Sequence, residues 1–207
     1  MKAFLGYGAL GIQIEAFLKE DNPQFEVQYF DDDYISNNLP SIPFNHFKDN
    51  ILKYEWLITL GYKHLPLKQK LLNTIKENGG SFFSMIHKSA YVAPSANINE
   101  GVVVYPLCNI DKDVVIKECS LINNSVIISH NTTIGQCCYI SPGVTISGNV
   151  SIGDGTFIGA GTIIANGITI GNNVVIGIGS VITKNIEDRM NVIGNPLKIL
   201  GKPINLT

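Results

Sequence analysis

Hydrophobic positions in the second half of the chain recur at a fixed interval of six residues. Starting at Ile86 and ending at Ile182, every sixth residue is Val or Ile, without a single exception. An amphipathic helix repeats with a period of 3.6 and a strand alternates with a period of two, so neither element produces this spacing over so long a stretch. The pattern predicts a repeat architecture, which has to be recognised before any single element is assigned.

A second apolar position follows each of these residues after four steps. It is always small or β-branched, and between the two positions the chain is rich in Gly, Asn and Asp, as in "GDGT", "GAGT" and "GNNV". Such residues accept tight or left-handed backbone conformations. Two inward positions and one corner in every hexad predict a parallel β-solenoid, whose turns bury the apolar faces of their neighbours.

Stacking is what makes such a solenoid stable. Burying a Val or Ile contributes about 1.5 to 3 kcal/mol, which cannot offset the ordering entropy of one isolated hexad but can do so in a stack. The repeat alone leaves the function open, because solenoids of this kind also serve as inert scaffolds or as ice-binding surfaces.

The segment 1–85 has a different pattern, in which apolar strand-like runs alternate with amphipathic helical ones. The expected strands are 1–5, 25–33, 56–62 and 81–87, and the expected helices are 12–20 and 67–80. Alternation of strands and helices predicts a small parallel sheet, which we expect to be Rossmann-like. The hexads begin where the second half of a full dinucleotide-binding fold would start, which favours a mononucleotide or a nucleotide sugar over NAD.

Composition removes several classes of function. Fifteen basic and seventeen acidic residues give a net charge of −2, and no dense basic stripe is available to bind nucleic acid. The apolar start is too short and too rich in glycine for a signal peptide or a membrane span, so we expect a cytoplasmic protein. The four cysteines have no CxxC spacing, and free thiols are expected.

The first expected strand runs into Gly6-x-Gly8-x-x-Gly11, and a helix follows it. The second strand ends in Asp31, Asp32 and Asp33. Glycines at such a turn let the backbone and a helix N-terminus approach an anionic group, while carboxylates accept hydrogen bonds from a ribose or base. The segment predicts a nucleotide site, and the alternative is a tight turn beside a solvated acidic loop.

One histidine interrupts the solenoid wall. His130, in "ISHNTTIGQ", is the third residue of its hexad and is expected to point outward. Imidazole titrates near neutral pH and is the usual general base of acyl transfer. An isolated histidine on such a wall is also commonly a plain solvent-facing residue, and the residues alone leave both interpretations open.

Together these segments resemble the hexapeptide-repeat acetyltransferases that act on nucleotide-linked amino sugars, a family that includes the sialic acid O-acetyltransferases and the bacillosamine-pathway enzymes. The resemblance implies a Rossmann-like nucleotide-sugar-binding domain over 1–85 and a left-handed parallel β-helix with its C-terminal tail over 86–207. It also implies a homotrimer with three hexads in each triangular coil.

The resemblance assigns candidate residues to the nucleotide sugar and to catalysis. The substrate would be held by Gly8, Ala9, Leu10, Gly11, Asp31, Asp32, Gly61, Tyr62 and Lys63. Relatives commonly have a histidine in the place of Leu10. The "SHN" and "SGN" segments make His130 the general base, Asn131 a residue that orients it, and the Gly148 N–H an oxyanion donor. For Asn131 the alternative is a plain corner residue.

The co-substrate implied is acetyl-CoA, with no metal and no acyl-enzyme. Its contacts would be Ala160, Asn166, Ile178, Lys184, Pro196 and Lys198, in a groove between two subunits. We therefore expect N-acetylation of a nucleotide-linked amino-dideoxy sugar, with a dTDP-4-amino-4,6-dideoxyhexose as the first choice, for lipopolysaccharide O-antigen or capsule synthesis. The alternatives are O-acetylation of sialic acid or another sugar, and a non-catalytic nucleotide-binding scaffold.

Overall fold

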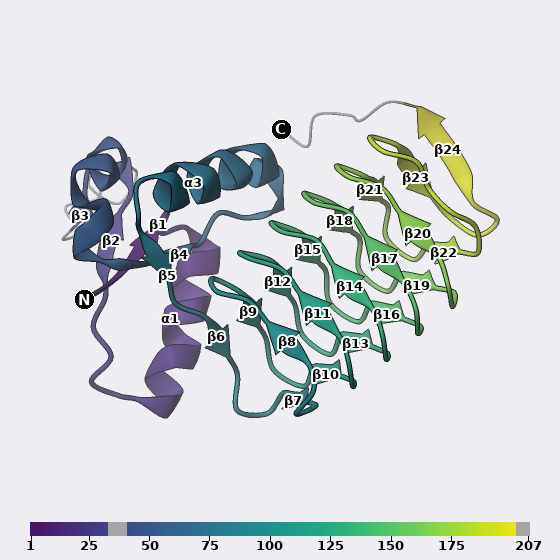
Figure 1. Cartoon of the computed structure of the whole chain (residues 1–207), viewed down its shortest axis with the longest axis horizontal. Helices are drawn as coiled ribbons and strands as arrows, with labels where there is room; N and C mark the ends of the chain where they lie inside the picture. The colour runs from purple at the N-terminus through teal and green to yellow at the C-terminus, as the bar shows by residue number, and fades with distance from the viewer. Residues whose placement is uncertain (33–40, 202–207) are drawn as a thin grey trace.

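The structure, a computed structural model, describes residues 1–32 and 41–201. It consists of an N-terminal α/β domain placed at one end of a long parallel β-solenoid (Figure 1). Within the described ranges, no helix has the length and apolar character needed to cross a membrane. Asp33 and the last residues of the expected C-terminal tail lie outside the described residues.

The N-terminal domain is built on a five-stranded parallel sheet with the order β3-β2-β1-β4-β5. Its strands are β1 (Lys2–Leu5), β2 (Gln28–Phe30), β3 (Ser41–Ile42), β4 (Glu55–Ile58) and β5 (Ser81–Phe82). Its helices are α1 (Ala9–Asp21), the 3-10 helices η1 (Phe44–Lys53) and η2 (Tyr62–His64), and α3 (Leu65–Glu77). Both predicted helices are present, and the sequence pattern missed β3 and η1.

The two faces of this sheet are covered differently because strand residues alternate between them. On one face Phe4 and Leu57 pack with Ile14 of α1, and on the other Leu5 and Trp56 pack with α3. Three of the expected strands differ in the structure. The second is confined to β2, and the third ends at Ile58, because Tyr62 already begins η2. The expected strand 81–87 is two strands, of which β5 joins the N-terminal sheet and β6 opens the solenoid.

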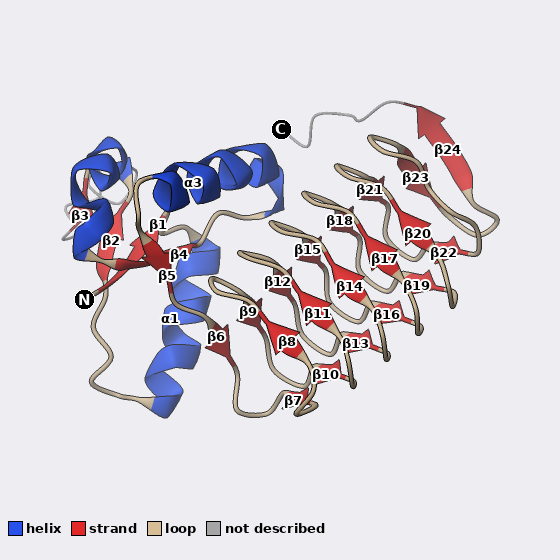
Figure 2. Cartoon of the chain, in the orientation of Figure 1, coloured by secondary structure: helices blue, strands red, loops and turns tan. Residues whose placement is uncertain are grey.

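The solenoid has three flat faces, drawn as stacked strands in Figure 2. The first face contains β6 (Met85–Ile86), β9 (Val103–Val104), β12 (Leu121–Ile122), β15 (Tyr139–Ile140), β18 (Phe157–Ile158), β21 (Val175–Ile176), β23 (Asn191–Ile193) and the antiparallel β24 (Lys198–Gly201). The second contains β7 (Tyr91–Val92), β10 (Asn109–Ile110), β13 (Ile127–Ile128), β16 (Thr145–Ile146), β19 (Ile163–Ile164) and β22 (Val181–Ile182). The third contains β8 (Asn97–Ile98), β11 (Val115–Ile116), β14 (Thr133–Ile134), β17 (Ser151–Ile152) and β20 (Thr169–Ile170).

The predicted hexads are confirmed residue by residue. Each Val or Ile of the hexad series ends a strand, and from Val92 onward the series forms one continuous core with the apolar residues four positions later, whereas Ile86 in the first strand is exposed. Neighbouring coils are in register, so that each residue lies beside its equivalent three hexads further along, as Ile128 lies beside Ile146. The result is a parallel β-solenoid of the left-handed β-helix type.

Left-handed backbone conformations mark the corners. From Gly101 to Gly179 every sixth residue has a positive φ, including non-glycine residues such as Asn131 (φ 56°) and Asn149 (φ 57°). Asn tolerates this region better than most side chains. A residue placed just before a left-handed corner is held at the same place in every coil, so that equivalent side chains of successive coils lie in columns.

Candidate functional site

The glycine-rich turn lies between β1 and α1. Gly6 has a φ of 90°, and a Cβ there would approach Leu60 Cδ2 at 2.7 Å, so the turn requires glycine on both counts. Gly8 is the N-cap of α1 and gives it no side-chain cap. The first N–H groups of the helix are therefore left for solvent or a ligand, as expected of an anion-binding turn.

A cavity of about 620 Å³ opens at this turn. The predicted substrate residues that line it are Gly8, Ala9, Leu10, Asp31, Gly61, Tyr62 and Lys63. They come from the ends of β1, β2 and β4, which are adjacent strands of the parallel sheet. The cavity therefore lies at the carboxyl ends of the strands, where ligands bind in open α/β sheets.

Two predicted substrate residues have other contacts and do not line the cavity. A Cβ at Gly11 would lie 3.0 Å from Tyr7 Cδ2 and 3.5 Å from Thr59 Oγ1, so this glycine serves the close packing of α1 on the sheet. The exposed carboxylate of Asp32 accepts a hydrogen bond from the Phe44 N–H (2.9 Å), at the start of η1.

Several lining residues were missed by the sequence analysis. They are Tyr7, Gln13, Thr59, Leu60, His64 and Tyr139, whereas Gly6 belongs to the predicted glycine turn. Gln13 follows Ala9 by one helical turn, and Thr59 and Leu60 directly precede Gly61, so their places could have been inferred from the expected elements. Tyr139 belongs to the solenoid, and only the packing of the two domains brings it to the cavity.

A polar network holds the Gly-rich turn against the sheet. The Tyr7 N–H donates to Asp31 Oδ2 (2.7 Å), and the Tyr7 hydroxyl donates to the buried carboxylate of Glu15. Glu15 also accepts a hydrogen bond from Tyr29 (2.9 Å) and pairs with Lys19 (2.6 Å). These contacts fix the backbone that lines the cavity before any ligand binds.

His130 lies at the corner between the second and third faces of the solenoid, directly before the left-handed residue Asn131. Its Nδ1 is 2.9 Å from Asn131 Oδ1. A carbonyl oxygen only accepts, so this contact suits a neutral imidazole that carries its hydrogen on Nδ1 and its lone pair on Nε2. Asn131 is a corner residue, and its side chain also contacts the His130 ring, so both interpretations given above stay open.

Gly148 lies one coil further along the same corner and contacts the imidazole ring. A Cβ at Gly148 would lie 2.7 Å from both Nε2 and Cε1 of His130, and 3.1 Å from Asn166 Nδ2. Gly148 is buried and, within the described part of the chain, its N–H has no backbone acceptor. The structure therefore brings together His130, Gly148 and Asn166 in one column. Lys184 follows β22, where Ile186 bridges Ile170 and the spacing of one full coil is no longer kept, and no contact places it in this column.

The other predicted co-substrate contacts lie elsewhere. Ala160 and Ile178 form a second column, at the corner between the first and second faces, and are linked by the Gly179 N–H, which donates to Ala160 O (2.8 Å). Pro196 is in the exposed turn between β23 and β24, and the exposed Lys198 begins β24. Within one chain these residues do not join the His130 column.

The cavity and His130 also lie on different sides of the prism. Tyr139, which lines the cavity, is on the first face, whereas the corner of His130 joins the second and third faces and is opposite it. In a single copy of the chain the cavity and His130 are therefore separated by the solenoid.

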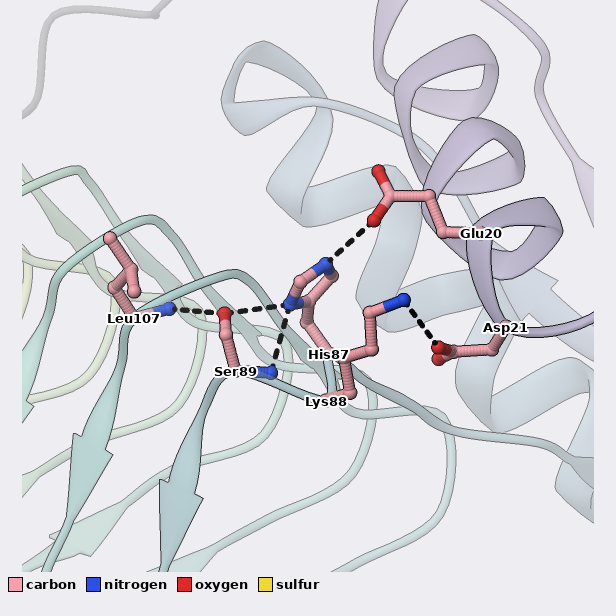
Figure 3. A network of polar contacts seen from close by, with 6 residues as sticks. All are labelled: Glu20, Asp21, His87, Lys88, Ser89 and Leu107. Carbon is pink, nitrogen blue, oxygen red and sulfur yellow. Dashed lines mark hydrogen bonds and ion pairs between the residues drawn. The ribbon is translucent and has the colours of Figure 1, made fainter.

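The remaining solenoid histidine has structural contacts. His87 Nε2 is 3.3 Å from Glu20 Oε2, and His87 Nδ1 is 2.8 Å from Ser89 Oγ, which accepts the Leu107 N–H (Figure 3). With the adjacent Lys88–Asp21 ion pair, this network attaches the end of α1 to the first coils. Across the described ranges there is no cluster of three or more His, Cys, Asp or Glu suited to hold a metal ion.

The cysteines are free and buried, as predicted. Burial raises the pKa of Cys138 to about 12 and the pKa of Cys137 to about 11, so neither is a thiolate near neutral pH. A nucleophilic cysteine needs a lowered pKa and access to substrate. The thiols act instead as small apolar groups.

Comparison with known proteins matches both the repeat and the whole chain. The bacterial transferase hexapeptide (six repeats) family model matches residues 149–184. The acetyltransferase domain of PglB from Neisseria gonorrhoeae is 27% identical, with a TM-score of 0.85, over 96% of this chain and 98% of that one. That domain has also been solved with acetyl coenzyme A.

PerB from Caulobacter crescentus, solved with CoA and GDP-perosamine, is 27% identical, with a TM-score of 0.86, over 96% of each chain. WeeI from Acinetobacter baumannii, at 21% identity and a TM-score of 0.82 over 97% of this chain and 99% of that one, shares the fold. The resemblance to the hexapeptide-repeat nucleotide-sugar acetyltransferases is thereby confirmed, and the protein is an acetyltransferase.

Proposed function

We propose that this protein transfers the acetyl group of acetyl-CoA to the amine of a nucleotide-linked amino sugar, with His130 as the general base. The observation that carries the proposal is the contact of the His130 ring with Gly148, in a chain that matches PerB from end to end. PerB binds CoA and GDP-perosamine, which is the ligand chemistry that we assign to this chain.

In the proposed reaction the amine attacks the thioester carbon while Nε2 of His130 removes its proton. Asn131 keeps the hydrogen on Nδ1, which leaves Nε2 free to accept. Negative charge develops on the thioester oxygen of the tetrahedral intermediate, and the Gly148 N–H beside the ring would stabilise it. Collapse of the intermediate expels the CoA thiolate, which takes up the proton from the imidazolium.

We further propose that residues 1–85 form a Rossmann-like domain that binds the nucleotide in the 620 Å³ cavity. Gly8, Ala9 and Leu10 at the start of α1 would contact the diphosphate, and Asp31 would accept a hydrogen bond from the ribose or base. A dTDP-linked 4-amino-4,6-dideoxy sugar is our first choice of substrate, in the synthesis of a surface glycan.

A homotrimer would complete the site. The cavity and His130 lie on opposite sides of one solenoid, so a neighbouring copy would supply the missing half. The second face carries a line of exposed apolar side chains that a neighbour could cover, namely Tyr91, Ile127 and Ile163. The two columns of co-substrate residues would then border one groove between subunits.

Replacement of His130 tests the proposal directly. Purified protein is incubated with acetyl-CoA and a panel of dTDP-, UDP- and GDP-linked amino sugars or sialic acid, and products are identified by mass spectrometry. His130→Ala should lower turnover by about two to four orders of magnitude. His46→Ala, at an exposed histidine of η1, is the matched control and should retain activity.

Each arm of this experiment has a distinct result. An N-acetylated nucleotide sugar as the product supports the proposal, and O-acetylated sialic acid would replace it with the alternative reaction. Near-full activity of His130→Ala would remove His130 as the base. If calorimetry found nucleotide binding but no acetyl-CoA binding, the protein would be a scaffold rather than an enzyme.

A further inference from the structure

A tyrosine of the solenoid forms part of the wall of the nucleotide cavity. Tyr139, at the start of β15, points out of the first face and lines the cavity together with residues of the N-terminal domain. Its half-buried ring contacts Tyr62 of η2, at 5.7 Å between centroids, and Phe157 of the next coil, at 5.9 Å. These ring contacts hold the position of its hydroxyl group.

The direction of the hydroxyl hydrogen is set by a neighbour. The Nδ2 of Asn123 donates to Tyr139 Oη (3.2 Å), and the Oδ1 of Asn123 accepts the Asn124 N–H (2.8 Å). Asn123 is buried, and a backbone N–H can only donate, so the amide cannot be turned around. Tyr139 Oη therefore receives a hydrogen from Asn123 and must direct its own hydrogen elsewhere.

Because Tyr139 lines the cavity, a ligand bound there can supply an acceptor for that hydrogen. Within the described residues, the Tyr139 hydroxyl has no hydrogen bond other than the one from Asn123. Burial raises the pKa of Tyr139, so the hydroxyl keeps its hydrogen at neutral pH. A donor fixed in direction at a cavity wall is complementary to an oxygen acceptor.

We infer that Tyr139 is a specificity-determining residue of the cavity, whose hydroxyl donates a hydrogen bond to an oxygen of the bound nucleotide sugar. Asn123 is its positioning residue, because it fixes the direction of the donor without lining the cavity. The inference rests on the proposed function of the cavity. It makes the solenoid a part of nucleotide-sugar recognition, in addition to its part in catalysis.

The test is a calorimetric titration of the full-length protein with two ligands, a nucleoside diphosphate and the corresponding nucleotide amino sugar that the enzyme acetylates. Tyr139→Phe removes only the hydroxyl and should raise the Kd about tenfold or more if the acceptor is a charged oxygen, and less if it is neutral. A loss with both ligands places the acceptor on the nucleotide, and a loss confined to the nucleotide sugar places it on the sugar.

A second variant reverses the direction of the hydroxyl while leaving it in place. Asn123→Asp puts a carboxylate in the place of the amide, so that the Tyr139 hydroxyl donates to it instead of to the ligand. We expect a weakening similar to that of Tyr139→Phe, and the two changes combined should weaken binding little more than either one. Additive losses would overturn the role of Asn123.

The control is Tyr54→Phe, at a tyrosine in the core of the N-terminal domain that does not line the cavity, and it should leave the Kd unchanged. Thermal unfolding of each variant checks that the fold is retained. Equal affinity of wild type and Tyr139→Phe for both ligands would overturn the inference and leave the proposed function intact. A wild-type protein that binds neither ligand would overturn the proposed function, and the inference with it.

Discussion

The two domains solve the problem of positioning polar groups in opposite ways. The solenoid has a repetitive core made mostly of Val and Ile, and the regular stacking of its coils aligns equivalent residues in columns, as at the corner of His130 and Gly148. The N-terminal domain has an irregular core around Phe30 and Trp56, and its cavity is formed by segments at the ends of strands. Repetition gives rigidity to the proposed catalytic column, whereas irregular connections give the cavity a shape that can be specific.

The boundary between the two domains is itself part of a packed core. Residues of the first solenoid face, such as Leu121 and Tyr105, share one apolar cluster with Phe4 of β1 and Ile14 of α1. Cys119 and Cys137, from the corner between the third and first faces, share another with Leu72 of α3. The N-terminal domain is therefore fixed to the solenoid. In Figure 1, helix α3 lies above the first coils of the solenoid.

The largest effect should come from adding one methyl group to the proposed catalytic column. Gly148→Ala would place a carbon 2.7 Å from Nε2 and Cε1 of His130, so the ring must leave its position. We expect turnover to fall by about three orders of magnitude, comparable to the loss of a general base, with a small change in thermal stability. Steady-state kinetics measure the turnover, and thermal unfolding of the same preparation measures the stability.

The control for this variant is Gly143→Ala, at another corner of the solenoid. The added methyl group would meet no atom within 4 Å, but the residue has a φ of 67°, so the change costs stability through the backbone alone. Gly143→Ala should therefore lower the melting temperature and keep the turnover of the wild type. The comparison fails if Gly148→Ala keeps its activity, since the column would then tolerate displacement of His130.

The repeat made the solenoid side of the site predictable and left most of the cavity unpredicted. The spacing of one coil between His130, Gly148 and Asn166 could be counted on the chain, because each coil repeats the geometry of the one before. The place of Tyr139 depends on how the N-terminal domain packs against the first face, and no local pattern encodes that. Asp32 followed a strand as expected, yet its carboxylate bonds the Phe44 N–H of a helix that the pattern did not reveal.

The second-largest predicted effect is a change in the free energy of unfolding, and it comes from a buried lysine at the domain boundary. Lys68 of α3 is only 1% exposed, and burial lowers the pKa of its amine, against smaller opposing effects from Cys119, Cys137 and Cys138. Because the folded pKa lies below that of the unfolded chain, the unfolded state binds more protons, and the free energy of unfolding rises with pH between the two values. Below the folded pKa the amine is charged in both states, so the whole cost of burying the charge is subtracted from the free energy of unfolding.

Lys68→Met should consequently stabilise the protein at neutral pH, by about 1 to 3 kcal/mol, because it removes a buried charge and keeps an unbranched apolar side chain. The gain should shrink as the pH is raised towards about 10, where the unfolded lysine also loses its proton. Urea unfolding of both proteins over this pH range measures the difference. A gain that does not change with pH would mean that packing, and not the charge, separates the two proteins.

The smallest effect concerns an ion pair at the outer edge of the same boundary. Lys76 Nζ of α3 is 2.7 Å from Glu118 Oε1 and 3.3 Å from Glu100 Oε1, both on the solenoid. The hydrogen bond from Lys76 lowers the pKa of Glu118, and its contribution to stability is therefore present above the unfolded carboxyl pKa and lost as the pH falls through the folded value. Solvent screens this pair, since Lys76 is 39% exposed.

Lys76→Met should lower the free energy of unfolding at neutral pH by about 0.2 to 1 kcal/mol, and less at high salt. Lys70→Met is the matched control, because Lys70 is an exposed residue of the same helix with no ion pair among the described residues. The difference between the two variants should vanish under acid conditions that protonate Glu118. If the difference between the two variants persisted under acid conditions, Lys76 would act through its aliphatic chain. The edge of the domain boundary would then be held by apolar packing, like the centre of the boundary.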